Sequence, residues 1–261
     1  MLVSEVMLQQ TQATRVIEPW RRFMASLPTP SACAASPRSA VIALWGGLGY
    51  NRRAGYLHDA ARVILDEFDG FVPSDPDALR RLPGVGAYTA NAVASFAFGL
   101  GVGVLDTNVG RILARALVNR PLARSEAQRL ADELVRGRAS AAHNQAMLDL
   151  GAQFCTANPR CPTCPMASRC AWRAVGGPDP AQYSAAVSVR QSAFVGSDRQ
   201  CRGRIIAVLR DGPSNLDALL VRIAEPRERV ERLLAALVGD GLVEHGAHSV
   251  HLVGDTRERV G

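Results

Sequence analysis

Four of the six cysteines stand close together in the spacing C-x5-C-x2-C-x5-C. They are Cys155, Cys161, Cys164 and Cys170. Thiolates at such short intervals, with prolines between them, are typical ligands of a [4Fe–4S] cluster. A structural zinc site usually joins two C-x2-C pairs, so one pair with long flanks fits zinc less well. We therefore expect a [4Fe–4S] cluster, with zinc as the alternative, and we expect Cys33 and Cys201 to be buried apolar thiols.

A second group of residues suits chemistry on a nucleic-acid backbone or sugar. Leu82-Pro83-Gly84-Val85-Gly86 lies between two helical patterns, which is typical of a tight turn between helices. Glycines can take positive φ and leave backbone N–H groups uncovered, and such groups at a helix start can bind one phosphate. Further along, Asp106 ends an apolar run and begins a helix, with Asn108 beside it. The turn alone could be structural, but the nearby carboxylate favours chemistry.

These residues belong to longer motifs, which are S-E-V-M-L-Q-Q-T-Q at 4–12, L-P-G-V-G-A-Y-T-A at 82–90 and L-D-T-N-V at 105–109. Together with the cysteines they resemble the adenine DNA glycosylase branch of the helix–hairpin–helix base-excision glycosylases. The resemblance covers residues 1–172. It implies an all-α fold with a six-helix domain at 1–102 and an iron–sulfur cluster domain at 103–175. A linker at 176–197 and a C-terminal module at 198–261 complete the predicted division.

Two acidic side chains carry the chemistry that the resemblance implies. From its position alone, Glu5 is a surface residue that compensates a helix dipole. In the family, the glutamate of this motif faces the base pocket, where a carboxylic acid with a raised pKa can protonate N7 of a leaving adenine. Asp106, which also fits a helix N-cap, is the second carboxylate. When ionised it would stabilise the developing oxocarbenium ion or bond to it transiently.

Tyr88 and Asn108 are expected to orient this pair of carboxyl groups by hydrogen bonding. Bifunctional relatives attack the sugar with a lysine amine at the position of Tyr88. This sequence contains no lysine, because all thirty of its basic residues are arginine. We therefore expect base removal without lysine-dependent strand cleavage.

The DNA-binding residues are expected in two loops. Gln10 and Tyr50 match family residues that wedge into the duplex where the target base is flipped out. Tyr50 lies in G-L-G-Y-N-R-R at 47–53, which we call the wedge loop. The family usually has a second tyrosine where this chain has Asn51, so this loop is altered. Arg52 and Arg53 are expected to meet phosphates, with solvated surface arginines as the alternative. The hairpin is expected to bind the backbone through Leu82, Gly84 and Gly86.

The spacing of apolar residues predicts the helices that position these loops. Residues 28–37 and 176–191 read as a loop and a linker, and Pro19 as a break within helical residues 4–27. Further helices are predicted at 39–45, 53–68, 75–81, 87–98, 106–118, 125–135 and 142–155. After residue 197, three helices (198–210, 216–223 and 226–238) precede a short hairpin. This order resembles a winged-helix module, and a helical cap packed on the main domain is the alternative.

The composition is compatible with a nucleic-acid partner but does not require one. The formal net charge is +6, although a high-GC genome would also favour arginine. The sequence lacks a long apolar stretch and a basic-then-apolar N-terminal signal. We expect a cytoplasmic, nucleoid-associated monomer that binds double-stranded DNA with a mismatched or damaged base pair, and no membrane.

The chain departs from the resembled family at three places. The first gap of its cysteine motif is one residue short. The family has an additional segment before S-E-V, so we expect a truncated gene model with weak or absent activity. The residues after 197 are too few and too helical for the β-rich domain that reads 8-oxoguanine in the family.

These observations predict a monofunctional DNA glycosylase of base excision repair that removes adenine mispaired with 8-oxoguanine or guanine. A uracil or thymine mismatch glycosylase of the same fold is the first alternative. Tyr88 and Asp106 fit it equally, whereas Glu5 with Gln9 and Gln10 argues against it. A non-catalytic iron–sulfur DNA-binding protein is the second alternative.

Overall fold

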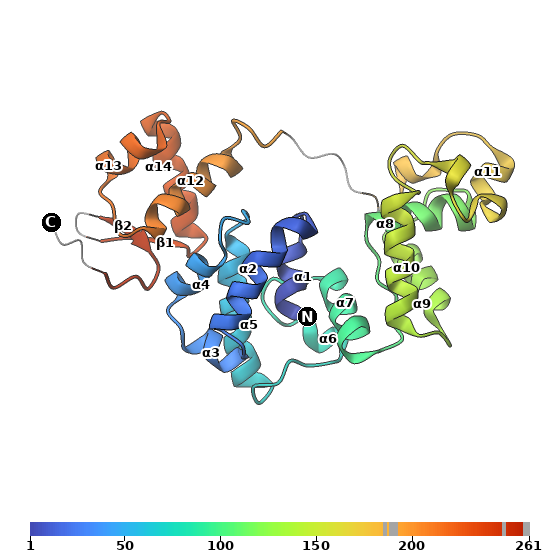
Figure 1. The fold of residues 1–261 in the computed structure, drawn as a ribbon, viewed down its shortest axis with the longest axis horizontal. Coiled ribbons are helices and arrows are strands. Elements are labelled where there is room, and N and C mark those ends of the chain that lie inside the picture. Colours follow the sequence, from blue (N-terminus) through green and yellow to red (C-terminus); the bar gives the residue numbers. More distant parts are fainter. Residues whose placement is uncertain (185–186, 188–192, 247–248, 258–261) are drawn as a thin grey trace. The chain divides into compact units, whose positions relative to one another are not determined.

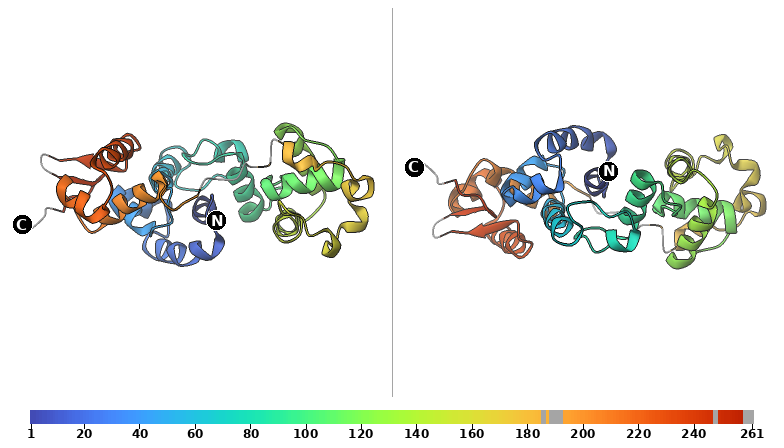
Figure 2. Two further views of the ribbon diagram at one scale, coloured as in Figure 1. Left: turned by 90° about the horizontal axis from the view of Figure 1, so that it is seen from above. Right: turned by 90° about the horizontal axis from the view of Figure 1, so that it is seen from below.

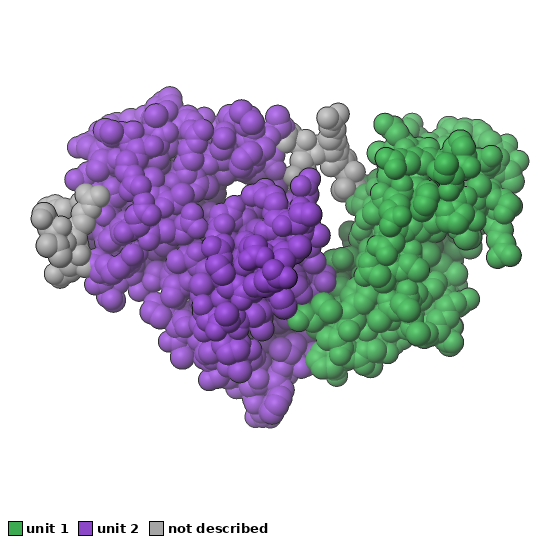
Figure 3. Space-filling model, viewed as in Figure 1, with its two compact units in different colours: residues 1, 74–77, 86–191 green, residues 2–73, 78–85, 192–261 purple. Residues whose placement is uncertain are grey.

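The computed structural model describes residues 1–184, 187, 193–246 and 249–257 and is mostly helical (Figure 1). None of its helices in these ranges combines the length and apolar character that a bilayer-spanning segment requires. The chain forms two compact units (Figure 3): unit 1 contains residues 1, 74–77 and 86–191, and unit 2 contains residues 2–73, 78–85 and 192–261. This division cuts the chain differently from the four predicted domains, which stay a prediction.

Unit 2 begins with α1 (Leu2–Leu8), α2 (Ala13–Ser26), α3 (Pro30–Ala35), α4 (Arg38–Leu44) and α5 (Arg52–Glu67). Their apolar faces are buried, and the large side chains of Phe23, Trp45 and Ile64 lie in this core. Burial of an apolar helix face, rather than helix propensity, stabilises helices this short. The first residues of the chain, which include Glu5, are therefore held by tertiary packing.

Two predictions about this region were wrong. Residues 28–37 are not all loop, because α3 begins at Pro30 with Thr29 as its N-cap, whose Oγ1 accepts a hydrogen bond from Ala32 N at 3.1 Å. Proline suits the first turn of a helix, where its missing N–H costs nothing. Pro19 does not end a helix either, since it lies buried inside α2. Burial in the core offsets the lost backbone hydrogen bond.

The C-terminal part of unit 2 contains the predicted order of elements. Helices α12 (Asp198–Arg210), α13 (Leu216–Ile223) and α14 (Arg227–Gly239) precede β1 (Val243–His245) and β2 (Val250–Leu252). The strands are antiparallel, with Glu244 opposite His251, and they pack on α12 and α14 (Figure 2). The middle of the predicted hairpin, residues 247–248, lies outside the described residues. The winged-helix interpretation stays a prediction.

This C-terminal module also packs as a cap on the first helices of unit 2. Helix α4 contacts α12 and β2. Ser39 Oγ donates a hydrogen bond to Gly254 O at 3.2 Å. The winged-helix module and the helical cap, which are the two alternatives for residues 198–261, are therefore compatible. Three helices and a hairpin in this order can also pack as a cap.

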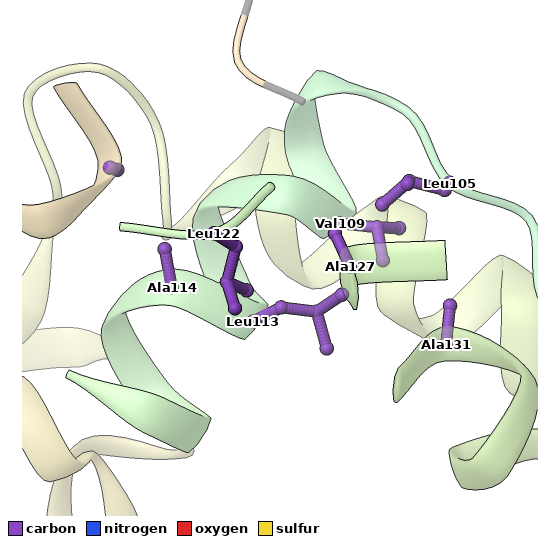
Figure 4. Close-up of a cluster of buried hydrophobic side chains, with 8 residues drawn as sticks. Leu105, Val109, Leu113, Ala114, Leu122, Ala127 and Ala131 are labelled. Carbon is purple, nitrogen blue, oxygen red and sulfur yellow. The ribbon is translucent and has the colours of Figure 1, made fainter. Parts of the chain in front are cut away.

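The short helix α6 (Pro76–Leu79) precedes the hairpin, and α7 (Ala87–Phe98) follows it in unit 1. Helix α7 ends as predicted at Gly99, whose φ of 70° suits glycine. Unit 1 continues with α8 (Thr107–Ile112), a π-helical stretch (Leu113–Val118), α9 (Arg124–Val135), α10 (Ser140–Gln153) and α11 (Ala171–Val175). Their core includes Leu105, Val109, Leu113 and Leu122 (Figure 4).

The predicted linker is partly structured. Pro180–Tyr183 form a 3-10 turn, and Ala181 is buried in the core of unit 1. Residues 185–186 and 188–192 of the predicted linker lie outside the described residues. The composition of this stretch predicted a linker throughout, but a short segment of it packs into the core of unit 1.

Candidate active site and nucleic-acid interface

Glu5 lies on α1 in unit 2, and its side chain is buried, with 7% of its surface exposed. Its Oε2 atom has no hydrogen-bond partner among the described residues. Burial disfavours the charged form and raises the pKa of this carboxyl above its ordinary value of 4.5. The position therefore differs from that of a surface residue at a helix start. A carboxyl group of this kind can carry a proton that it later donates.

The two residues predicted to wedge into DNA share an uncommon backbone conformation. Gln10 has φ 53° and Tyr50 has φ 48°, both in the left-handed region that non-glycine residues seldom adopt. Such strain persists only where the surroundings impose it, and it is frequent at binding sites. Gln10 is exposed, and Tyr50 has 37% of its surface exposed. Both side chains can therefore reach a ligand outside the protein.

Arg53 takes a different place from the one predicted, because it is buried rather than available to phosphates. Its Nη1 donates to the carbonyl oxygens of Val6, Met7 and Gln9 at 2.7, 2.9 and 2.6 Å. Its Nη2 donates to Thr11 Oγ1 at 3.0 Å. Burial lowers the pKa of this guanidinium to about 10. Arg53 therefore ties the end of α1 to the wedge loop. Its neighbour Arg52 is exposed and lies 3.6 Å from Asp240 Oδ1, and its phosphate role stays a prediction.

We expect Arg53→Met to destabilise the protein by about 2–4 kcal/mol, because it leaves several buried carbonyl oxygens without a donor. Urea unfolding measures this difference. Arg52→Met is the matched control, since it removes an exposed arginine next to it and should cost no more than about 0.5 kcal/mol. Equal losses in the two variants would contradict the structural role of Arg53.

The hairpin residues divide into buried and exposed ones. Gly84 has φ 77°, and a Cβ atom there would lie 2.8 Å from Tyr56 Cβ, so only glycine fits. Its carbonyl accepts a hydrogen bond from Gln9 Nε2 at 3.2 Å. Gly86 is exposed and is the N-cap of α7 with φ −91°, so positive φ is needed only at Gly84. Leu82 has 2% of its surface exposed, so only its backbone remains for the predicted DNA contact.

Asp106 is the N-cap of α8 in unit 1, as predicted. Its Oδ1 accepts a hydrogen bond from Val109 N at 2.8 Å, and its Oδ2 accepts one from Asn108 Nδ2 at 2.7 Å. Burial raises the pKa of this carboxyl, and the hydrogen bonds from Val109 and Asn108 act against that rise. The pairing of Asp106 with Asn108 is thus as predicted. Tyr88 is half-buried on the first turn of α7, and its predicted role stays a prediction.

A buried arginine that the sequence analysis missed holds Asn108 in place. Arg111 Nη2 donates to Asn108 Oδ1 at 2.5 Å, and Arg111 Nε donates to Cys155 O at 2.5 Å. A Cβ on Gly151 of α10 would lie 2.6 Å from Asn108 Cβ, so the helices touch at this glycine. Arg111 occupies the side-chain carbonyl oxygen of Asn108, so the Nδ2 group of this amide is the one that donates to Asp106. The feature of the sequence that could have indicated this residue is an arginine among the apolar residues of a predicted helix.

The four motif cysteines line one hollow in unit 1, and all are free thiols. Arg115, which is 2% exposed, donates to Cys155 Sγ at 3.5 Å and to Thr156 O at 2.7 Å. It also pairs with Asp179 at 2.6 Å. Within the described residues, no three His, Cys, Asp or Glu side chains converge closely enough to hold a metal ion as they stand. The donor set nevertheless fits a thiolate-bound cluster, because four thiols and a buried cation surround one apolar hollow.

Comparison with known proteins decides the family. Residues 3–137 match the family model described as HhH-GPD superfamily base excision DNA repair protein. The chain is 42% identical over 253 residues to a protein named adenine DNA glycosylase from Mycolicibacterium smegmatis, covering 94% of this chain and 84% of that protein. The chain belongs to the HhH-GPD superfamily, in its adenine DNA glycosylase branch. It is therefore a DNA glycosylase of base excision repair.

Further relatives agree with this family. An adenine DNA glycosylase of Mycobacterium tuberculosis is 43% identical over 252 residues, covering 93% of this chain and 81% of that protein. A solved thermostable thymine-DNA glycosylase superposes on the chain with a TM-score of 0.61 at 28% identity, covering 66% of this chain and 82% of that one. A trapped endonuclease III–DNA covalent intermediate gives 0.60 at 28% identity, covering 65% and 81%. The HhH-GPD fold assigned from the sequence is thus confirmed.

Proposed function

We propose that the chain is a monofunctional adenine DNA glycosylase that removes adenine mispaired with 8-oxoguanine or guanine. The observation that carries the proposal is the buried carboxyl of Glu5, whose raised pKa suits a proton donor. The relatives named adenine DNA glycosylase are 42–43% identical to the chain, against 28% for the thymine-DNA glycosylase. Adenine is therefore favoured over thymine as the leaving base.

In this proposal the two carboxyl groups act at opposite ends of the breaking bond. Glu5 donates its proton to N7 of adenine, and the N-glycosidic electron pair leaves with the base. The ionised carboxylate of Asp106 stabilises the positive charge that develops on the sugar, and Asn108 and Tyr88 orient it. Water then adds to the anomeric carbon and loses one proton to bulk water, which leaves an abasic site; the Glu5 carboxylate takes up a proton from water before the next turnover. Because the sequence has no lysine, we expect no strand cleavage through a lysine Schiff base.

The DNA-facing residues follow from the same proposal. The chain binds mismatched double-stranded DNA as a monomer, with Gln10 and Tyr50 entering the space left by the extruded nucleotide. Arg52, which is exposed, binds a backbone phosphate. The uncovered backbone N–H groups at Gly84 and Gly86 bind another.

Base release from defined duplexes tests the proposal. Purified protein is incubated with duplexes that contain A:8-oxoG, A:G, T:G or U:G, and half of each sample is then treated with alkali. We expect strand breaks only after alkali and only with the two adenine duplexes. Release from T:G or U:G alone would identify the protein as a mismatch glycosylase of the other kind, and binding without release would identify a non-catalytic protein. Breaks without alkali would contradict the monofunctional mechanism.

A [4Fe–4S] cluster is the cofactor we propose for the cysteine hollow. When bound, the cluster would cross-link residues 155–170 through Cys155, Cys161, Cys164 and Cys170, and Arg115 would supply a compensating positive charge. We expect about four iron atoms per chain, lost in Cys164→Ser. Cys201→Ser is the control, because Cys201 is buried in unit 2. About one zinc atom per chain and no iron would favour the alternative metal.

A further inference from the structure

The connection between α7 and α8 in unit 1 carries Asp106 at its end. Residues 103–105 of this connection are buried, so their backbone N–H and C=O groups have lost water as a partner. A buried backbone group without a hydrogen bond costs free energy, and such groups are therefore almost always paired. In residues 102–104 side chains of three surrounding helices, α7, α9 and α10, supply partners.

Asn144 of α10 binds two backbone groups of the 102–104 segment at once. Its Oδ1 accepts a hydrogen bond from Val104 N at 3.1 Å, and its Nδ2 donates to Val102 O at 2.9 Å. The same Nδ2 donates to Ser95 Oγ of α7 at 2.9 Å. Asn144 is buried, and its amide has two N–H donors, so both of them are engaged in these bonds. This side chain therefore joins α7, α10 and the segment ahead of Asp106.

Gly103, in the middle of the segment, is held by α9 and α7. Its N–H donates to Asp132 Oδ1 at 2.8 Å, and its carbonyl accepts from Gln128 Nε2 and Asn91 Nδ2, both at 2.9 Å. A Cβ atom on Gly103 would lie 2.5 Å from the backbone carbonyl carbon of Ala131, so the segment lies directly against α9. The backbone of residues 102–104 cannot shift without breaking bonds to these helices.

These contacts fix Asp106 relative to α7. Asp106 follows Val104 by two residues and is the N-cap of α8, while Tyr88 lies on the first turn of α7. Asn144 connects the two elements, because it binds Val104 on one and Ser95 on the other. A reacting group that moves by about 1 Å can lower a rate about 100-fold. The side chain of Asn144 is therefore placed to affect the reaction without touching the substrate.

We propose that Asn144 is a positioning residue for Asp106. It holds the 102–104 segment so that the carboxylate stays where positive charge develops on the sugar. This inference rests on the proposed function for the role of Asp106. It adds a residue of α10 that lies beyond residues 3–137, the part of the chain that matches the family model.

Asn144→Ala tests the proposal, because it removes all three bonds. We expect the single-turnover rate of adenine release from an A:8-oxoG duplex to fall about 10- to 100-fold. The Kd for this duplex should stay unchanged, since Gln10, Tyr50 and the hairpin lie outside these contacts. Asn144→Asp keeps the acceptor for Val104 N and should release adenine at an intermediate rate. It serves for the same comparison if the alanine variant does not fold.

Ser184→Ala is the matched control, because Ser184 is also buried in unit 1 and also joins two segments. Its Oγ accepts a hydrogen bond from Leu122 N at 3.1 Å and donates one to Pro180 O at 3.1 Å. We expect this variant to lower Tm, as Asn144→Ala does, and to release adenine at the wild-type rate. All rates are compared at a temperature at which every variant is fully folded.

Amide hydrogen exchange tests the contact itself in protein without DNA. Asn144→Ala should speed exchange of the Val104 amide about 10-fold or more, because this N–H loses its acceptor. Ser184→Ala should speed exchange of Leu122 and leave Val104 unchanged. NMR follows both amides in the same samples.

The inference is overturned if Asn144→Ala and Ser184→Ala release adenine equally fast, if Kd rises as much as the rate falls, or if exchange at Val104 does not respond. If the wild type releases no adenine while exchange responds as expected, the proposed reaction is wrong and the contact of Asn144 with the 102–104 segment stands. If the wild type releases adenine and the two variants match, the positioning role is wrong and the reaction stands.

Discussion

We expect Glu5→Gln to lower the single-turnover rate of adenine release about 100- to 10,000-fold and to leave duplex binding unchanged. The amide keeps the size of the side chain but has no acidic proton to give to the leaving base, and general acid catalysis typically contributes a factor of this size. Glu5 is buried, and its Oε2 has no hydrogen-bond partner among the described residues, so the amide breaks no hydrogen bond at that atom. The rate is measured with A:8-oxoG duplex at enzyme excess, and binding by fluorescence anisotropy.

Glu18→Gln is the matched control for this change. Glu18 lies on α2 with an exposed side chain that pairs with Arg21 at 2.7 Å. An exposed pair of this kind contributes little to stability, so this variant should release adenine at the wild-type rate. Equal rates in Glu5→Gln and the wild type would remove Glu5 from the mechanism.

We expect Asp106→Asn to lower the same rate about 100- to 1,000-fold, because in the proposed mechanism the developing positive charge loses the carboxylate that stabilises it. The cap of α8 should survive, since asparagine is as good an N-cap as aspartate and can accept the hydrogen bond from Val109 N. Its amide nitrogen, however, replaces the Oδ2 atom that accepts from Asn108 Nδ2, so two donors face each other and the variant should lose about 1–3 kcal/mol of stability. Thermal unfolding measures this loss, and the rate is compared at a temperature at which the variant is fully folded.

Asp132→Asn repeats the chemical change at a second carboxylate of unit 1 that caps a backbone group. Asp132 Oδ1 accepts a hydrogen bond from Gly103 N at 2.8 Å, a bond that the amide oxygen can also accept. We expect normal adenine release from this variant. If Asp106→Asn released adenine as fast as Asp132→Asn, Asp106 would only cap α8 and would have no part in the reaction.

The pH dependence follows from the same two groups. In the proposed mechanism base release needs Asp106 ionised and Glu5 protonated, so we expect the rate to rise and then fall with pH, and the residual rate of Glu5→Gln to lose the falling limb. Because burial raises both pKa values above their ordinary values of 3.8 and 4.5, the native state binds protons more tightly than the unfolded chain. The free energy of unfolding from these groups is therefore highest below the ordinary values. It falls as pH rises through the raised pKa values.

The sequence was sufficient for features that depend on neighbouring residues. The start of α8 at Asp106 could be predicted because an aspartate that ends an apolar run can cap a helix, its side chain accepting a hydrogen bond from the backbone N–H three residues further on. The end of α7 at Gly99 followed from the same local logic. Motif resemblance, rather than periodicity, singled out Glu5, since nothing local distinguishes a buried glutamate at a helix start from an exposed one.

The residues that were wrongly predicted or overlooked have partners in distant segments of the chain. Arg53 was expected at the surface because it follows a loop, but carbonyl oxygens 44 to 47 residues away converge on it. Arg111 and Arg115 were overlooked because their partners, Cys155 O and Asp179, are also far along the chain. A side chain with several donors can be buried wherever acceptors meet, and the sequence does not show where they meet.

In the proposed mechanism adenine leaves after protonation at N7. The most direct test is single-turnover release from a duplex in which 7-deazaadenine, which lacks N7, stands opposite 8-oxoguanine. We expect the wild type to bind this duplex normally and to release its base no faster than Glu5→Gln releases adenine. Release of 7-deazaadenine at the rate of adenine would contradict it.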